Sequence, residues 1–132
     1  MYKLILILIC SFLSFPCFAK WKKIIETKTF TDFIETGSVK KKNGIIYLWT
    51  LRNFIKKQKN GEKSLKLYSR YDCNTIKYEV LSIISYKTQM GKGRKFFYKK
   101  NVMDYSDNSN WIYPNVDDEV YRLMKVICSL NK

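Results

Sequence analysis

Two cysteines, Cys73 and Cys128, restrict the folds that are open to this 132-residue chain. Cys73 ends a stretch in which apolar and polar residues alternate, the pattern of a half-buried β-strand. Cys128 lies near the C-terminus on the apolar stripe of a predicted amphipathic helix. A disulfide between them would tie this helix to the apolar face of the strand, and in the chain-entropy model it stabilises the fold by roughly 4 kcal/mol.

The N-terminus indicates the compartment in which such a bond forms. Residues 1–19 have the layout of a secretory signal peptide: a basic residue at position 3, an apolar run over 4–15, and Ala19 before the polar Lys20. The apolar run is too short to cross a bilayer, which takes about 20 helical residues. We therefore expect cleavage after Ala19, no transmembrane segment after cleavage, and a single domain over residues 20–132.

Cleavage at this point removes two of the four cysteines. Cys10 and Cys17 lie within the signal segment, and neither follows the small residues that are typical of a bacterial lipid-attachment cysteine. Lipidation at one of them is the weaker alternative. An even pair of cysteines in an oxidising compartment predicts one disulfide, Cys73–Cys128, in preference to two free buried thiols.

Most of the mature chain has the pattern of β-strands joined by short turns. The stretch from Ile45 to Arg52 alternates strictly, with its odd-numbered side chains on one face and its even-numbered side chains on the other. Before it, residues 41–44 are predicted to form a turn, because Asn-Gly is favoured in two-residue hairpins. Short turns between successive strands favour an antiparallel meander over crossover connections. The β-prone segments are 21–27, 29–35, 45–54, 65–73, 76–87 and 94–100.

The C-terminal segment changes to a helical period. Pro114-Asn115 ends the extended chain, and the acidic residues 117–119 are expected at a helix N-terminus, where negative charge is favourable. The predicted fold class is α+β: an antiparallel, meander-like sheet of about five to six strands, with one C-terminal α-helix packed on it and tied by the disulfide. The apolar stripe of this helix consists of Val116, Val120, Leu123, Met124, Ile127 and Cys128.

Several short motifs follow one another in a characteristic order. Gly44 precedes a Tyr-Leu-Trp-Thr-Leu strand, Tyr71-Asp72 precedes Cys73, and the closing helix ends in Cys128. The other positions of the series are Trp21, Asp32, Gly37-Ser38, Met90-Gly91-Lys92-Gly93, Trp111 and Pro114. Together they resemble the surface-adhesin protein E-like domain family over nearly the whole mature chain. The resemblance implies a small antiparallel sheet with a C-terminal helix tied across it by a disulfide.

The resemblance also implies a function. A well-known member of this family is an adhesin at the outer surface that binds host matrix and plasma proteins, including vitronectin, laminin and plasminogen. This chain is therefore expected to be an exported binding domain. Its expected location is the periplasm, the cell surface or the medium.

The chain lacks residues that common catalytic and metal sites need. It contains no histidine, which excludes a Ser-His-Asp or Cys-His arrangement and a His-ligated zinc site. The acidic residues 117–119 are better explained as helix-start charges than as a carboxylate site. Asp104 and Asp107 lack the tight ligand repeat of a calcium loop. We predict no enzyme activity, no metal and no cofactor.

Basic residues outnumber acidic ones by 25 to 11 and give a net charge of +14. They gather in three clusters near predicted turns, and strand pairing is expected to merge these clusters into an electropositive edge. Such a surface attracts anionic ligands; the alternative is that the lysines only keep the sheet soluble and its edges unpaired. The aromatic residues 96–98 of the third cluster are predicted to lie in the core. The clusters are Lys40, Lys41 and Lys42; Lys56, Lys57 and Lys59; and Lys92, Arg94, Lys95, Lys99 and Lys100.

Three classes of function are compatible with these features. The favoured class is a non-catalytic binding or adhesion domain whose ligand is an extracellular protein, an anionic glycan or a lipid. The alternative is a periplasmic protein that binds anionic cell-wall or lipid components. A small basic secreted nuclease is disfavoured by the absence of histidine, and no nucleic-acid partner is expected. Whether the chain forms a homodimer through an exposed edge strand stays open.

Overall fold

The computed structural model describes residues 21–100 and 110–130. The predicted signal peptide, residues 1–19, lies outside the described residues, as do Asp104 and Asp107. The cleavage point after Ala19 therefore stays a prediction.

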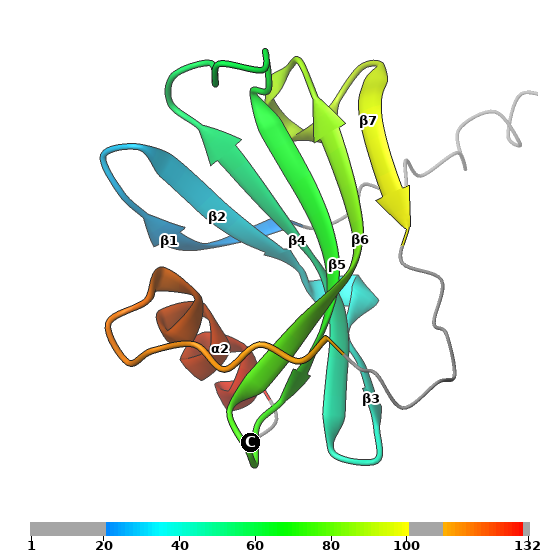
Figure 1. The fold of residues 1–132 in the computed structure, drawn as a ribbon, viewed down its shortest axis with the longest axis vertical. Helices are drawn as coiled ribbons and strands as arrows, with labels where there is room; N and C mark the ends of the chain where they lie inside the picture. Colours follow the sequence, from blue (N-terminus) through cyan, green and yellow to red (C-terminus); the bar gives the residue numbers. More distant parts are fainter. Residues whose placement is uncertain (1–20, 101–109, 131–132) are drawn as a thin grey trace, which may run out of the picture.

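The described chain forms one antiparallel sheet with the C-terminal helix on one side of it (Figure 1). The strands pair in the order β1-β2-β4-β5-β6-β7, and β3 pairs with β4 as well. This arrangement confirms the predicted α+β class and the meander, with seven strands in place of about five to six. The strands are β1 Trp21–Glu26, β2 Phe30–Glu35, β3 Lys40–Lys42, β4 Ile45–Phe54, β5 Ser64–Asp72, β6 Lys77–Tyr86 and β7 Lys95–Lys100.

The additional strand is β3, and it corrects the predicted turn. Lys41 and Lys42 do not lie in the turn but in β3, where they pair with β4. Only Asn43 and Gly44 form the turn, with φ angles of 52° and 77°, as a hairpin turn with two positive φ angles requires. The β3 strand forms here because β2 pairs with the C-terminal half of β4 alone. Without β3, the first half of β4 would leave an unpaired edge.

The two faces of β4 differ as its alternating pattern predicts from Ile45 to Thr50, whereas after this point the odd-numbered Leu51 and Asn53 are buried as well. The even-numbered side chains Ile46 and Leu48 are fully buried and pack with the apolar stripe of the C-terminal helix α2, Glu119–Ser129. Full burial of one such aliphatic side chain contributes roughly 1.5–3 kcal/mol of hydrophobic stabilisation. The core cluster consists of Ile34, Ile46, Leu48, Tyr71, Leu123, Met124 and Ile127.

The helix begins later than the apolar stripe predicts. Val116, the first residue of the predicted stripe, lies before the helix and is 68% exposed. Asp118 is the N-cap residue, and its carboxylate accepts a hydrogen bond from the backbone N–H of Asn115 (2.8 Å). This turn takes Val116 off the helical period. Glu119 lies in the first helical turn, so the prediction of acidic residues at the helix N-terminus is confirmed.

The predicted disulfide between Cys73 and Cys128 is confirmed. The two Cα atoms are 5.8 Å apart, and the bond closes a span of 55 residues. Cys73 directly follows β5, and Cys128 lies near the end of α2. The bond therefore holds the C-terminal end of the helix against the sheet, beside the core cluster.

We expect Cys128→Ser to lower the free energy of unfolding by roughly 4 kcal/mol in non-reducing buffer, because the unfolded chain regains the freedom of a long loop. Urea denaturation followed by circular dichroism measures the difference between the two proteins. In excess reductant this difference should shrink. Equal urea midpoints without reductant would contradict a stabilising bond at this position.

Tyr71 is expected to make the fold less stable at alkaline pH. Its side chain is buried in the core, and this burial raises the pKa of the phenol from 10.0 to about 12. Between these values the folded protein keeps the proton that the unfolded chain has lost, so stability falls as the pH rises from about 10 to about 12. Tyr71→Phe should lose less stability than the wild type over this range. A parallel decline of the urea midpoints of both proteins would show that Tyr71 is not the cause.

Candidate functional site

The face of the sheet opposite α2 carries the odd-numbered side chains of β4 and is rich in aromatic residues. Trp49 of β4 pairs with Tyr68 of β5, so the two side chains share this face. Lys66 is two residues from Tyr68 on the same strand and therefore points to the same side. We call this surface the aromatic face; it consists of Trp21, Tyr47, Trp49, Lys66, Tyr68 and Tyr86.

Three aromatic rings in the middle of this face contact one another. The ring centroid of Tyr68 lies 5.1 Å from that of Trp49 and 6.5 Å from that of Tyr47. All three side chains are half-buried. Burial raises the pKa of the Tyr68 phenol, and the neighbouring Tyr47 raises it further. The Tyr68 hydroxyl therefore stays protonated at neutral pH, where it both donates and accepts hydrogen bonds.

A cavity of about 290 Å³ opens on the aromatic face beside these rings. The Nζ atom of Lys66 lies 5.5 Å from the centroid of the Trp21 ring and 5.4 Å from that of the Tyr86 ring, within the range of cation–π attraction. Every strand except β3 contributes to the lining, so the curvature of the sheet creates this Lys66 cavity. It is lined by Trp21, Glu35, Trp49, Lys66, Ile84, Tyr86 and Lys95.

The Lys66 cavity carries an excess of positive charge. Burial lowers the pKa of the Lys66 ammonium, the Glu35 carboxylate opposes this effect, and the Lys95 ammonium adds to it. Two lysines and one carboxylate thus face the same partly desolvated space. A lysine whose charged form is disfavoured in this way is a candidate for a binding role, because an anion that enters the cavity compensates its charge.

The loop between β6 and β7 lies against the stem of Lys66. The Asn53 side-chain oxygen accepts a hydrogen bond from the backbone N–H of Met90 (2.7 Å), and the Ser64 hydroxyl accepts one from that of Gly91 (2.9 Å). A Cβ atom on Gly91 would overlap Cε of Lys66, and Gly91 has a φ of 58°. Glycine at this position therefore allows the loop to approach and limits where the Lys66 side chain can go.

Two of the three predicted basic clusters meet at one end of the sheet. The β4–β5 loop and the β6–β7 loop both lie at the top of Figure 1. They are joined by the Asn53–Met90 contact and by a hydrogen bond from Gln89 Nε2 to the Phe54 carbonyl oxygen (3.4 Å). We call the exposed cations of these loops the basic end: Lys56, Lys57, Lys59, Lys92 and Arg94.

The remaining cluster, Lys40–Lys42, lies at the opposite end of the sheet, in the β3–β4 hairpin at the bottom of Figure 1. The ten residues of β4 separate the two ends, a distance of about 30 Å. Strand pairing therefore does not merge all three clusters into one edge. Lys40 pairs with Tyr47, which places it on the aromatic face. There the three lysines and Tyr47 line an open hollow of about 620 Å³.

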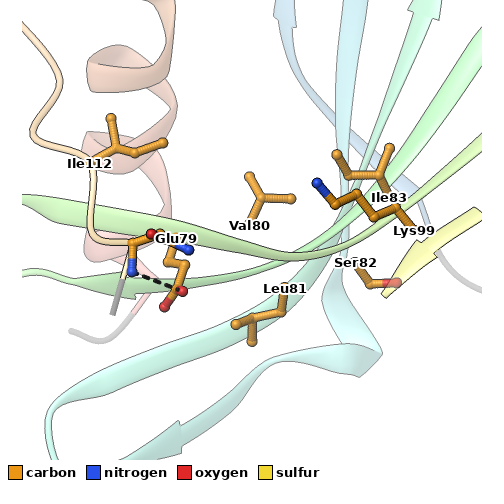
Figure 2. Close-up of a pocket in the computed structure, with 8 residues that line it drawn as sticks. Glu79, Val80, Leu81, Ser82, Ile83, Lys99 and Ile112 are labelled. Carbon is orange, nitrogen blue, oxygen red and sulfur yellow. Dashed lines mark hydrogen bonds between the residues drawn. The ribbon is translucent and has the colours of Figure 1, made fainter. Parts of the chain in front are cut away.

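The third cluster is divided along β7. Lys95 lines the Lys66 cavity, whereas Lys99 lines a second hollow of about 160 Å³ beside β6 (Figure 2). In that hollow Glu79 accepts a hydrogen bond from the backbone N–H of Asn110 (3.3 Å). Lys100 is the last residue of β7, and its side chain lies outside the described part of the chain.

This second hollow offers less free polar chemistry than the Lys66 cavity. Its carboxylate, Glu79, is paired with the Arg70 guanidinium, whose Nε lies 2.7 Å from Oε2. The Arg70 guanidinium is also 4.4 Å from the centroid of the Trp111 ring. Glu79 therefore already has its partners, and the structural role of this pair is to hold residues 110–112 beside β6.

The aromatic residues Phe96, Phe97 and Tyr98 do not lie in the core, which corrects the prediction. Their exposed fractions are 38%, 48% and 55%. The reason is the position of β7, an edge strand whose only neighbour in the described sheet is β6. An edge strand that lies beyond the region packed by α2 leaves apolar side chains exposed on both of its faces.

The Lys66 cavity is the feature that sequence patterns miss. The alternation over residues 65–73 places Lys66 and Tyr68 on the side of β5 away from Cys73, which is a usable signal. It does not show that Trp21 and Lys95, from the two ends of the strand order, approach Lys66. That approach depends on sheet curvature, which has no local sequence pattern.

Two structural features are absent from residues 21–100 and 110–130. No group of histidine, cysteine, aspartate or glutamate side chains in these segments has an arrangement that would hold a metal ion. No helix in the same segments is both long and apolar enough to span a bilayer.

The burial of Lys66 predicts a pH-dependent difference between the wild type and Lys66→Met. Because the pKa of Lys66 is lower in the folded state than its ordinary 10.5, its charge lowers stability at neutral pH. This penalty disappears as the pH rises through the lowered pKa to 10.5. The wild type should therefore gain stability relative to Lys66→Met over this range, measured as urea midpoints. A relative loss of stability would mean that cation–π attraction to the Trp21 and Tyr86 rings stabilises the Lys66 charge more than burial destabilises it.

Comparisons with known proteins agree with this architecture. The fold is similar to the crystal structure of protein E from non-typeable Haemophilus influenzae, with a TM-score of 0.53 and 14% sequence identity over 89% of this chain and 82% of that chain. At this identity the similarity shows the fold alone. No curated protein sequence matches the chain. The sequence model of the surface-adhesin protein E family matches residues 21–129, and the chain therefore belongs to that family.

Proposed function

We propose that this chain is an exported, non-catalytic adhesion domain that binds an anionic region of a host matrix or plasma protein through its basic end. The observation that carries the proposal is the convergence of two lysine-rich loops that lie far apart in the sequence. Hydrogen bonds through Asn53, Gln89 and Met90 hold these loops together. The five positive charges of the basic end can therefore interact with the same ligand.

The electrostatic state of the basic end supports this role. Its five cationic side chains are exposed, and none of them forms an ion pair with another residue of the described chain. Their positive potentials add in the surrounding solvent, which increases the rate at which an anionic partner associates. Membership of a surface-adhesin family supports an extracellular protein as that partner.

The alternative location is the periplasm, where the ligand would be an anionic cell-wall or lipid component. One sequence feature favours it: neither Cys10 nor Cys17 follows the small residues that are typical of a lipid-attachment cysteine. Protease treatment of intact cells, with a known periplasmic protein as control, separates the two locations. Digestion from outside supports an adhesin, whereas protection until the outer membrane is opened supports the periplasmic alternative.

Reversing three charges of the basic end should weaken ligand binding. We expect the triple variant Lys57→Glu, Lys92→Glu, Arg94→Glu to raise the Kd for immobilised vitronectin and for a polyaspartate peptide by about tenfold or more at low salt, because both attraction and steering are lost. Binding of the wild type should also weaken as salt is added. Surface plasmon resonance at several salt concentrations measures both effects.

The matched control reverses three exposed cations elsewhere: Lys22→Glu, Arg122→Glu and Lys125→Glu. It changes the net charge by the same amount, so it should retain most of the binding if the basic end is the site. An equal loss in both triple variants would indicate attraction by net charge alone. Full binding by the basic-end variant would place the site elsewhere.

A further inference from the structure

The aromatic face has binding chemistry that adhesion through the basic end does not use. The Lys66 cavity presents the ammonium groups of Lys66 and Lys95 together with the Glu35 carboxylate. An ammonium group only donates hydrogen bonds, and an ionised carboxylate only accepts them. A ligand that satisfies all three groups therefore carries both negative charge and hydroxyl donors.

The rings next to the cavity add a requirement for shape. Trp49, Tyr68 and Tyr47 form a half-buried row of contacting rings along the middle of the sheet. The face of an aromatic ring is electron-rich, so it attracts the weakly positive C–H groups on the flat side of a sugar ring. Hydroxyl groups at the rim of such a sugar then remain free to reach the polar side chains around the row.

The far end of the row is basic as well. Tyr47 pairs with Lys40, and together with Lys41 and Lys42 they line the open hollow at the β3–β4 hairpin. Leu51, the β4 residue opposite Lys66, is four residues from Tyr47, which corresponds to about 13 Å along the strand. Cationic groups therefore flank the aromatic row at both ends on one face of the sheet.

We propose that the aromatic face binds an acidic oligosaccharide, a chain of sugar rings with carboxylate or sulfate groups. One acidic sugar occupies the Lys66 cavity, where Lys66 and Lys95 bind its anionic group and Glu35 accepts a hydrogen bond from a hydroxyl. The following sugars lie on Trp49, Tyr68 and Tyr47 and lead toward Lys40. This assignment rests on the proposed binding function. It adds to that function a class of ligand and a second binding surface.

The cavity also discriminates between acidic ligands. A volume of about 290 Å³ is at the lower end of the range for small-molecule sites, which suits a single ring. A phosphodiester backbone only accepts hydrogen bonds and offers Glu35 no donor, whereas a sugar ring offers several hydroxyl donors. These features favour an acidic sugar over a nucleic acid.

The test uses a heparin-derived tetrasaccharide and isothermal titration calorimetry with the full mature protein. We expect measurable binding by the wild type and at least tenfold weaker binding by Lys66→Met and by Trp49→Ala. The matched control is Lys125→Met, which removes another lysine over a ring, 5.1 Å from the Tyr121 centroid, on the helix; it should bind like the wild type. Maltotetraose, with the same number of rings and no charge, should bind more weakly than the acidic probe.

Folding of each variant is checked by circular dichroism and by the urea midpoint. Trp49→Phe keeps an aromatic ring in the row and should retain most of the binding, so it tests the stacking role even if Trp49→Ala fails to fold. The deciding comparison is the affinity of Lys66→Met for the tetrasaccharide against that of Lys125→Met. Equal affinity of these two variants overturns the site.

Failure of this inference is distinguishable from failure of the proposed function. If the basic-end triple variant loses the tetrasaccharide while Lys66→Met keeps it, the acidic sugar binds at the basic end, and the aromatic-face site is wrong. If the wild type binds polyaspartate but not the tetrasaccharide, the proposed function stands and this inference falls. If a thymidine oligonucleotide binds as tightly as the tetrasaccharide and is equally sensitive to Lys66→Met, the ligand class is wrong.

Discussion

The packing of α2 onto one face of the sheet determines how the other side chains of this protein are used. The helix buries Ile46 and Leu48 of β4, and the Cys73–Cys128 bond holds its C-terminal end in place. No second helix in the described chain covers the opposite face of the sheet, although Leu51, Ile84 and Tyr86 are buried there. Of the aromatic face, Tyr86 is buried, whereas the other side chains stay half-buried and available to a ligand: Trp21, Tyr47, Trp49, Lys66 and Tyr68.

The binding surfaces are nevertheless connected to the core. Asn53 and Ser64 are buried polar residues of β4 and β5, and their side chains hold the β6–β7 loop. No buried side-chain nitrogen or oxygen in the described residues lacks a hydrogen-bond partner, so these polar groups do not carry the cost of unsatisfied burial. The same contacts bring the two loops of the basic end together and position Gly91 against Lys66. Stability and ligand recognition thus share a small set of hydrogen bonds.

Local patterns predict the parts of the fold that depend on periodicity. The alternation in β4 correctly separates its two faces from Ile45 to Thr50 but fails at Leu51, which is fully buried on the aromatic face. The helical stripe correctly identifies Leu123 and Ile127 as core residues. The stripe fails at Val116, because the N-cap turn interrupts its period. The core prediction for residues 96–98 fails because hydrophobicity does not show that β7 is an edge strand. The turn prediction misses β3, because β3 exists only to pair with the part of β4 that β2 leaves open.

The sequence by itself determined the alternation, the helix stripe and the two cysteines, and these are enough for an antiparallel sheet with a stapled helix. Each of them is a local property that neighbouring residues impose through backbone geometry. Only the tertiary structure decided which basic clusters meet and that Lys66 lies between Trp21 and Tyr86. These contacts join strands from distant parts of the chain, and they arise from strand register and sheet curvature, which result from the packing of the whole sheet and not from any single segment.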